Sequence, residues 1–147
     1  MPAQQRTEGP YTYEISDRKA CITKYNGPGG AVSIPSTLGG YPVTSIGDDA
    51  FFRCSSLTSV TIPDSVTFIG SCAFFGCKSL TSVTIPDSVT SIGRDAFAGC
   101  TSRTSVTIPD SKRQLFDNSF KHEIQDDFRV TFVTTESWAR NSGYPLP

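Results

Sequence analysis

Cysteines at regular intervals are the first feature of this sequence that could do chemistry, because thiolates bind zinc and pair in disulfides. Cys54, Cys77 and Cys100 lie 23 residues apart, whereas the cysteine ligands of zinc sites come in pairs a few residues apart. Residues stacked in adjacent layers of a sheet are about 4.8 Å apart, more than the roughly 3.5–4.5 Å between the Cβ atoms of a disulfide. We therefore expect three reduced thiols in a core and predict no metal site.

Two further cysteines do not follow this series. Cys72 aligns with Asp49 and Asp95 at the 23-residue spacing, so we expect it near the surface, and Cys21 lies toward the N-terminus. The sequence leaves open whether either of them enters a disulfide.

A catalytic triad or a Cys-His pair would need His122, which is the only histidine. It lies in a charged stretch, residues 121–123, without a nucleophile motif around it. We therefore interpret His122 as a solvated side chain, predict no catalytic residue and do not expect an enzyme.

Carboxylates recur at the same step. Asp64, Asp87 and Asp110 each follow a proline, which is a typical turn sequence. Stacked carboxylates attract Ca²⁺ only where further oxygen ligands lie at loop spacing, and this sequence does not provide them. The glycines of residues 27–30 lack the lysine and hydroxyl residue of a phosphate-binding loop. We predict no cofactor.

Charge and hydropathy exclude other classes of partner. The chain has 13 Lys and Arg against 14 Asp and Glu, a formal charge of −1, so it has no basic excess for phosphates or anionic lipid. No segment approaches the roughly 20 apolar residues of a membrane-spanning helix, and residues 1–10 contain no apolar signal-peptide core. We predict no nucleic-acid partner and no membrane insertion; a signal removed before residue 1 stays open.

The elements that position these residues are internal repeats. The segment TSVTIPDS occurs unchanged at residues 58–65, 81–88 and 104–111, which gives a period of 23 residues. A period of this length is typical of stacked repeat proteins. One unit cannot bury its own apolar stripe, so we expect stacked units that share a continuous core.

Each unit is predicted to form one coil of a solenoid. In its strand, Val60 and Ile62 face the core, whereas Ser59 and Thr61 face outward. A proline ends the strand, a second extended stretch follows, and Ala73–Phe75 is interpreted as one helical turn.

The unit I-G-x-x-A-F-x-x-C-x-S-L-T-S-V-T-I-P-D-S-V-T-x resembles the BspA-like leucine-rich repeat, and residues 46–111 match it nearly position for position. With an opening half-repeat before them, the resemblance covers about residues 20–120. It implies a leucine-rich-repeat solenoid: short parallel β-strands forming one sheet, short helical turns and extended segments on the other side, and caps at both ends. Members of this family are known mainly as surface or secreted proteins, some of which bind host matrix proteins. The resemblance thus implies an extracellular or cell-surface location, and the sequence does not exclude the cytoplasm.

Three regions are expected along the chain. Residues 1–45 form an N-terminal tail, a hairpin cap and a first half-repeat, residues 46–120 form the repeats, and residues 121–147 form a C-terminal cap. Arg103 stands where Leu80 stood in the preceding unit, so the last repeat is degenerate and its packing stays open.

The functional candidate is the outward face of the predicted sheet, which is rich in hydroxyl groups and has one arginine near its edge. Its residues are Thr58, Ser59, Thr61, Thr81, Ser82, Thr84, Arg103, Thr104, Ser105 and Thr107. Ser and Thr also suit exposed strand positions without any ligand, so the pattern has a structural explanation as well. We predict a non-catalytic binding or adhesion module for a protein or glycan partner at a cell surface or in the extracellular matrix.

Two alternatives are kept. A structural spacer within a longer surface protein fits the repeats, although the predicted caps at both ends argue against it. Ice binding suits regular Ser and Thr arrays on β-solenoids, but only three layers carry the outward Ser-x-Thr pair. The sequence does not name the ligand or the oligomeric state.

Overall fold

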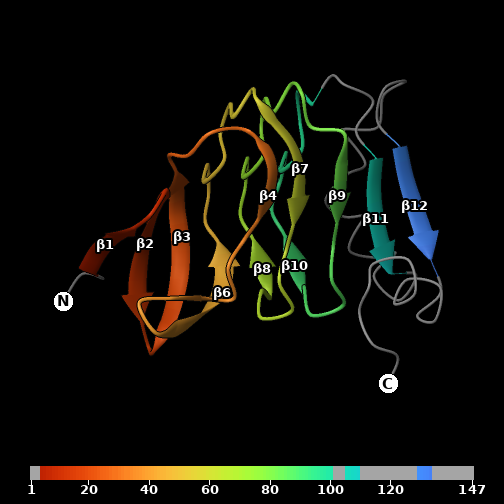
Figure 1. Ribbon diagram of the computed structural model, residues 1–147. Helices are drawn as coiled ribbons and strands as arrows, with labels where there is room; N and C mark the ends of the chain where they lie inside the picture. Colours follow the sequence, from red (N-terminus) through yellow and green to blue (C-terminus); the bar gives the residue numbers. More distant parts are fainter. Residues whose placement is uncertain (1–3, 101–104, 110–128, 134–147) are drawn as a thin grey trace.

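The structure is a computed structural model that describes residues 4–100, 105–109 and 129–133, and it shows a coil whose successive turns stack side by side (Figure 1). Two sheets run along the stack, which we name sheet A (order β1-β2-β3-β6-β8-β10, with β5 beside β6) and sheet B (order β12-β11-β9-β7-β4). The strands are β1 (Gln4–Glu8), β2 (Tyr11–Ser16), β3 (Lys19–Tyr25), β4 (Gly30–Ser33), β5 (Thr37–Leu38), β6 (Tyr41–Ile46), β7 (Leu57–Thr61), β8 (Phe68–Ile69), β9 (Ser82–Thr84), β10 (Ser91–Ile92), β11 (Ser105–Pro109) and β12 (Arg129–Val133).

Sheet B is the parallel sheet that the repeated strand segments predict. Val32, Val60, Val83 and Val106 are aligned in adjacent strands and are all buried. Thr61, next to Val60 in β7, is exposed, as the alternation of side chains along a strand requires. The predicted solenoid with parallel strands is confirmed.

Sheet A is formed by the return segments of the coils. Val66 N–H donates to the Pro63 carbonyl (3.1 Å) and closes the corner after sheet B, and the chain then runs back in β8. There Phe68 pairs in parallel with Ser45 on one side and Ser91 on the other. The prediction of a single sheet was wrong in this respect, because the short return segments also hydrogen-bond from layer to layer.

The third side of each coil is a turn segment, and no helix occurs in the part of the chain that the structure describes. Phe75 N–H donates to the Cys72 carbonyl within the turn (3.1 Å), whereas Phe74 N–H donates to Ala96 in the next layer (2.8 Å). Cys72 and Gly76 have φ of 57° and 71°, which an α-helix does not contain. The predicted helical turn was therefore wrong: left-handed residues direct alternate N–H groups along the stack.

The N-terminal strands extend sheet A. β2 and β3 form the predicted antiparallel hairpin, in which Tyr11 lies opposite Tyr25. β3 then pairs in parallel with β6, so the hairpin extends sheet A beyond the first repeat strand. Its role as a cap stays a prediction, as does the C-terminal cap over residues 121–147, of which the structure describes only β12.

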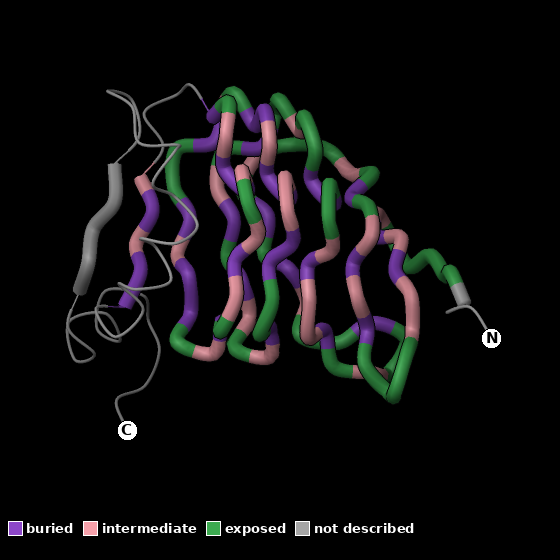
Figure 2. Tube along the Cα trace, turned by 180° about the vertical axis from the view of Figure 1, so that it is seen from behind, coloured by how far each residue is buried: buried purple, intermediate pink, exposed green. Residues whose placement is uncertain are grey.

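A column of aromatic rings fills the core beside the turns. The Phe51 and Phe74 ring centroids are 5.0 Å apart and those of Phe74 and Phe97 are 5.2 Å apart. The Tyr25 ring stacks on Phe51 with 4.9 Å between centroids, and the Tyr11 ring centroid lies 5.4 Å from that of Tyr25. Each such pair contributes roughly 0.5–1.5 kcal/mol beyond its buried area. Figure 2 shows the buried segments at corresponding places in successive coils.

The regularly spaced cysteines lie beside this column. Cys77 and Cys100 are buried, and their thiols donate to the Phe51 carbonyl (3.2 Å) and the Phe74 carbonyl (3.3 Å) of the preceding layer. Their prediction as core residues is confirmed. Cys54 packs against the core but is only partly buried, so the prediction holds only in part for the first layer. Cys72 is also partly buried, and none of the five cysteines forms a disulfide in the structure.

The assignment of inward and outward faces can be tested in the middle layer. Ile85→Asp should lower the free energy of unfolding by several kcal/mol, because it places an unpaired charge where the side chain is 0% exposed. Ser82→Asp should have little effect, because Ser82 is exposed. Thermal melts followed by circular dichroism measure both variants, and equal stability would show that the faces are assigned wrongly.

Thiol reactivity should separate the layers. Burial, reinforced by the neighbouring Cys100, raises the pKa of the Cys77 thiol to about 12. Burial also raises the pKa of Cys54, but the Lys24 ammonium acts in the opposite direction. In the native protein we expect a thiol reagent to modify Cys54 well before Cys77 and Cys100, as timed mass spectrometry would show. Equal rates for all three would contradict this ordering.

The same shift predicts a dependence of stability on pH. The Cys77 thiol ordinarily titrates at 9.0 and in the folded chain at about 12, so the unfolded state loses the proton first. The contribution of this thiol to stability is present below pH 9 and decreases as the pH rises toward 12.

Arg53 occupies a backbone position that glycine holds in the next two layers. Arg53, Gly76 and Gly99 have φ of 57°, 71° and 75°. The left-handed region costs a residue with a side chain roughly 1–2 kcal/mol, and glycine costs roughly 0.5–1 kcal/mol in chain entropy. Arg53→Gly should therefore raise the free energy of unfolding by up to about 1 kcal/mol in urea titrations. Gly99→Ala is the reverse control and should lower it; a destabilised Arg53→Gly variant would contradict the argument.

Candidate functional site

The predicted binding residues form two columns across sheet B. Ser59, Ser82 and Ser105 are aligned in β7, β9 and β11, and Thr61, Thr84 and Thr107 form the second column. All six residues are exposed or partly exposed. The structure thus brings together the hydroxyl residues at the outward strand positions, as predicted from the alternation of side chains.

The columns continue into strands that the sequence reasoning did not include. Ala31 and Ser33 of β4 align with the Ser and Thr columns, and both are exposed. At the other edge of sheet B, Arg129 and Thr131 of β12 stand in register with the same columns. The signal for β4 was present in the segment V-S-I-P at residues 32–35, which matches the repeated V-T-I-P.

The threonines beside these columns have a structural task. Thr81 donates both its backbone N–H (2.8 Å) and its hydroxyl (3.0 Å) to the Thr58 carbonyl of the preceding layer. On sheet A, the Thr67 hydroxyl likewise donates to the Thr44 carbonyl, and the Thr90 hydroxyl donates to Thr67. These layer-to-layer bonds favour threonine whether or not a ligand binds. Two further predicted residues, Arg103 and Thr104, lie outside the described residues.

The titratable residues with possible catalytic or metal-binding roles are not gathered into a site. Within residues 4–100, 105–109 and 129–133, no three His, Cys, Asp or Glu residues form a group that could hold a metal ion. Asp64 and Asp87 are exposed at their turns, and Asp110 and His122 lie outside the described residues. The expectations of no metal, no cofactor and no catalysis stay predictions.

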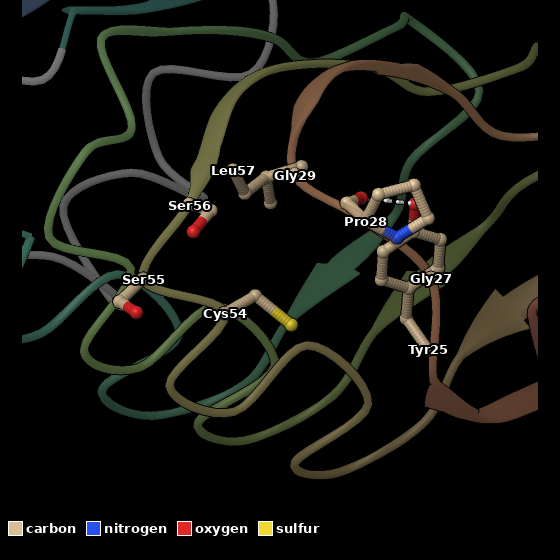
Figure 3. A pocket seen from close by; sticks show the side chains of 8 residues that line it. All are labelled: Tyr25, Gly27, Pro28, Gly29, Cys54, Ser55, Ser56 and Leu57. Carbon is tan, nitrogen blue, oxygen red and sulfur yellow. Dashed lines mark hydrogen bonds between the residues drawn. The ribbon is translucent and has the colours of Figure 1, made fainter.

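A pocket opens beside the first layer, between the turn before β7 and the loop before β4 (Figure 3). Its volume is about 240 Å³, and the Cys54 sulfur points into it from one side, opposite Tyr25 and Pro28. The Tyr25 hydroxyl donates to the Pro28 carbonyl (2.6 Å). Gly29 is required where the loop passes β7, because a Cβ atom there would overlap the Ser56 carbonyl. The Cys54 thiol does not make the bond to the preceding layer that Cys77 makes.

The aromatic anchors that the sheet face lacks occur on the turn side. The Phe52 and Phe75 rings stack at 5.2 Å with an angle of 11° between their planes, and Phe52 is 43% exposed. The Arg53 guanidinium lies over the Phe52 ring, 5.4 Å from its centroid. A second pocket of about 320 Å³ adjoins Phe52. The sequence signal was the second Phe of Phe51-Phe52 and Phe74-Phe75, one period apart.

No helix in the described part of the chain has the length and apolar character to cross a membrane.

Solved structures of bacterial leucine-rich-repeat proteins resemble this chain. A leucine-rich-repeat protein of Bacteroides capillosus is 35% identical with a TM-score of 0.75, and the match covers 88% of this chain and 98% of that one. A leucine rich cell surface protein of Faecalibacterium prausnitzii is 42% identical with a TM-score of 0.62 over 74% of this chain. This chain spans only 30% of the length of that protein.

Among curated proteins, no significant match is found. The family described as BspA type leucine rich repeat region matches residues 33–133 in six copies. This match covers well over half of the 147 residues. The chain therefore belongs to the BspA-type leucine-rich-repeat family.

Proposed function

We propose that this protein is a non-catalytic binding module that presents the outward face of sheet B to a protein or glycan partner at a cell surface or in the extracellular matrix. The observation that carries the proposal is the pair of hydroxyl columns, because the core does not require their identity. Proteins of this family are generally surface or binding modules, and the similar protein of Faecalibacterium prausnitzii is described as a cell surface protein.

The chemistry of the face suits a regular partner. Each hydroxyl both donates and accepts a hydrogen bond, and neighbouring strands repeat the same group about every 4.8 Å. The hydroxyls of Ser59, Thr61, Ser82 and Thr84 make no side-chain hydrogen bond within the described residues. The hydroxyls of Thr67, Thr81 and Thr90 differ because they are used between layers. The free hydroxyls are thus available to a ligand at no cost to the fold.

Each hydroxyl of the face should contribute little to affinity, and the affinity for a partner should rise with the number of layers that the partner contacts. It has no charge in the columns of β4, β7, β9 and β11, so attraction over long distances does not contribute. Many equivalent hydrogen bonds along one axis instead reward a partner with repeating groups, such as a glycan chain or an extended polypeptide.

Charge placed on the face tests the proposal. The triple variant Thr61→Lys, Thr84→Lys and Thr107→Lys should abolish binding to candidate surface or matrix partners and change the melting temperature little, because outward strand positions carry little packing energy. Surface plasmon resonance and thermal melts measure the two effects.

A matched control adds the same charge to the other sheet. Ser45, Phe68 and Ser91 form an outward column in three layers of sheet A, and their triple lysine variant should bind normally. Full binding by the sheet B variant would place the site elsewhere. Loss of binding in both variants would point to charge alone. Substrate turnover that disappeared with His122→Ala would overturn the non-catalytic assignment.

A further inference from the structure

The two sheets end at different places on the N-terminal side of the stack. Sheet A continues past β3 into β2 and β1, whereas sheet B ends at β4 among the described residues (Figure 1). β3 and β4 follow one another in the same coil, so sheet A extends two strands, roughly 10 Å, past the layer in which sheet B ends. We name the side of β4 that is turned away from β7 the open edge of β4.

Backbone groups at the open edge have no partner. Ile34 N–H donates to the Thr61 carbonyl of β7 (3.0 Å), and alternate residues of a strand direct their backbone groups to the same neighbour. Val32 therefore also faces β7, and Ala31 and Ser33 face the open edge. On that side, neither Ala31 nor Ser33 makes a hydrogen bond within the described residues. Two N–H and two carbonyl groups thus point outward in the plane of the sheet.

The core residues of β4 are less covered than their counterparts in the following layers. Val32 is 9% exposed, whereas Val60 and Val83 are 3% and 1% exposed. Ile34 is 5% exposed, and Ile62 is 0% exposed. Each residue of β4 packs against a neighbour in β7 but has no strand of sheet B on its other side. One further strand would complete the cover of the core here.

The open edge also lacks the features that keep an exposed edge from pairing. Proteins commonly protect edge strands with charged residues or proline. β1, the edge of sheet A on the same side of the molecule, carries Arg6 and Glu8. β4 has the sequence GAVS, without charge or proline. Of the two edges, only that of sheet B is suited to pair with another strand.

We propose that the open edge of β4 binds an extended segment of a partner polypeptide, which adds to sheet B as one more parallel strand. Such a segment presents N–H and carbonyl groups at the spacing that Ala31 and Ser33 require, and strand addition is a recurring mode of peptide recognition. All strand pairs of sheet B are parallel. The site uses backbone groups at an edge and does not depend on the function proposed for the outward face.

The orientation defines the chemistry of the segment. Apolar residues at alternate positions would pack on Val32 and Ile34, and the residues between them would point outward with Ala31 and Ser33. Pro35 has no N–H, so the pairing ends where β4 ends. The preferred segment is therefore short, alternates apolar and polar residues, and favours β-branched side chains.

A second copy of this chain does not fit the open edge in the same way. If two β4 edges paired, each copy would bring its own β2 and β1 roughly 10 Å past its β4. These strands would occupy the same space below the joined sheet. A single extended segment has no such layer behind it and avoids the overlap.

A peptide with the sequence of the repeat tests the proposal. The segment TSVTIP occurs in three repeats and pairs in parallel with its own copies in β7 and β9, so the probe is this hexapeptide with both ends capped. In nuclear magnetic resonance titrations on the 147-residue chain, the amide protons of Ala31 and Ser33 should shift downfield as they form hydrogen bonds. Amides of β1 should not shift.

Two N-methylated peptides are matched controls for the backbone bonds. In a parallel pair, the inward residues of the preceding strand donate to the next strand, as Ile34 donates to Thr61. N-methylation of the valine and isoleucine of the probe should therefore abolish binding. N-methylation of the serine and the second threonine should leave it nearly unchanged, because those N–H groups point to solvent.

Variants of Ser33 test the same contact from the side of the protein. Ser33→Pro removes an N–H that faces the open edge, and proline is tolerated at such positions of edge strands. It should weaken the probe by roughly 3- to 10-fold, the range expected for one backbone hydrogen bond. Ser33→Ala removes only the hydroxyl and should bind normally. Thermal melts check that both variants fold.

Several outcomes would overturn the proposal. Equal binding of the two N-methylated peptides would show that no strand is added, and a block by the serine and threonine methyl groups alone would show antiparallel addition. Normal binding by a folded Ser33→Pro variant would place the peptide elsewhere. In sedimentation experiments, a dimer that Ser33→Pro converts to a monomer would assign the open edge to a second copy.

Discussion

Backbone hydrogen bonds between layers, present on all three sides of each coil, are the interaction on which this structure depends. Thr81 N–H donates to Thr58 in sheet B, Gly93 N–H to Ile69 in sheet A, and Phe74 N–H to Ala96 on the turn side, at 2.7–2.8 Å. These bonds hold successive layers about 4.8 Å apart, so each side chain meets its own counterpart one period away. At the positions that recur unchanged, a residue must pack against a copy of itself. Planar rings, β-branched residues and threonine hydroxyls meet this condition, and they are the residues that recur.

The sequence predicted the solenoid because burial in it follows from a repeated pattern. In every copy a buried valine is followed by an outward threonine, as in Val60 and Thr61. One copy alone cannot bury its apolar residues, so the copies must stack. The turn side was not predictable in the same way. Ala73-Phe74-Phe75 has the composition of a helical turn, but Cys72 and Gly76 adopt left-handed conformations because their layer must donate hydrogen bonds to the next one. That demand comes from the neighbouring layer, and of these two positions only the glycine marks it in the sequence. The second sheet was missed for a related reason: its strands in the repeats are two residues long and exist only through pairing between layers.

The candidate site also has one part that the sequence predicts and one part that it does not. The outward columns of sheet B could be read from alternation alone, and β4 extends them through a segment that matches the repeat. The pockets could not be read, because they arise where the period changes. Tyr25 stacks on Phe51, 26 residues later, although the repeat elsewhere has 23 residues. The first layer thus has three additional residues, and Asn26 takes the position that Phe52 has in the next layer. Both features require the register of the first layer, which only the structure supplies.

The position of the pockets follows from the same packing rule. Where layers repeat perfectly, each side chain is covered by an identical one, and the described repeats therefore present a uniform face that suits a regular partner. The first layer departs from this identity while still sharing the hydrogen bonds and the inner aromatic column of the stack. Both described pockets border Tyr25, whose ring is held by Phe51 on one side and Tyr11 on the other. The stacked repeats thus hold the first layer in position, and the first layer forms pockets that identical repeats do not form.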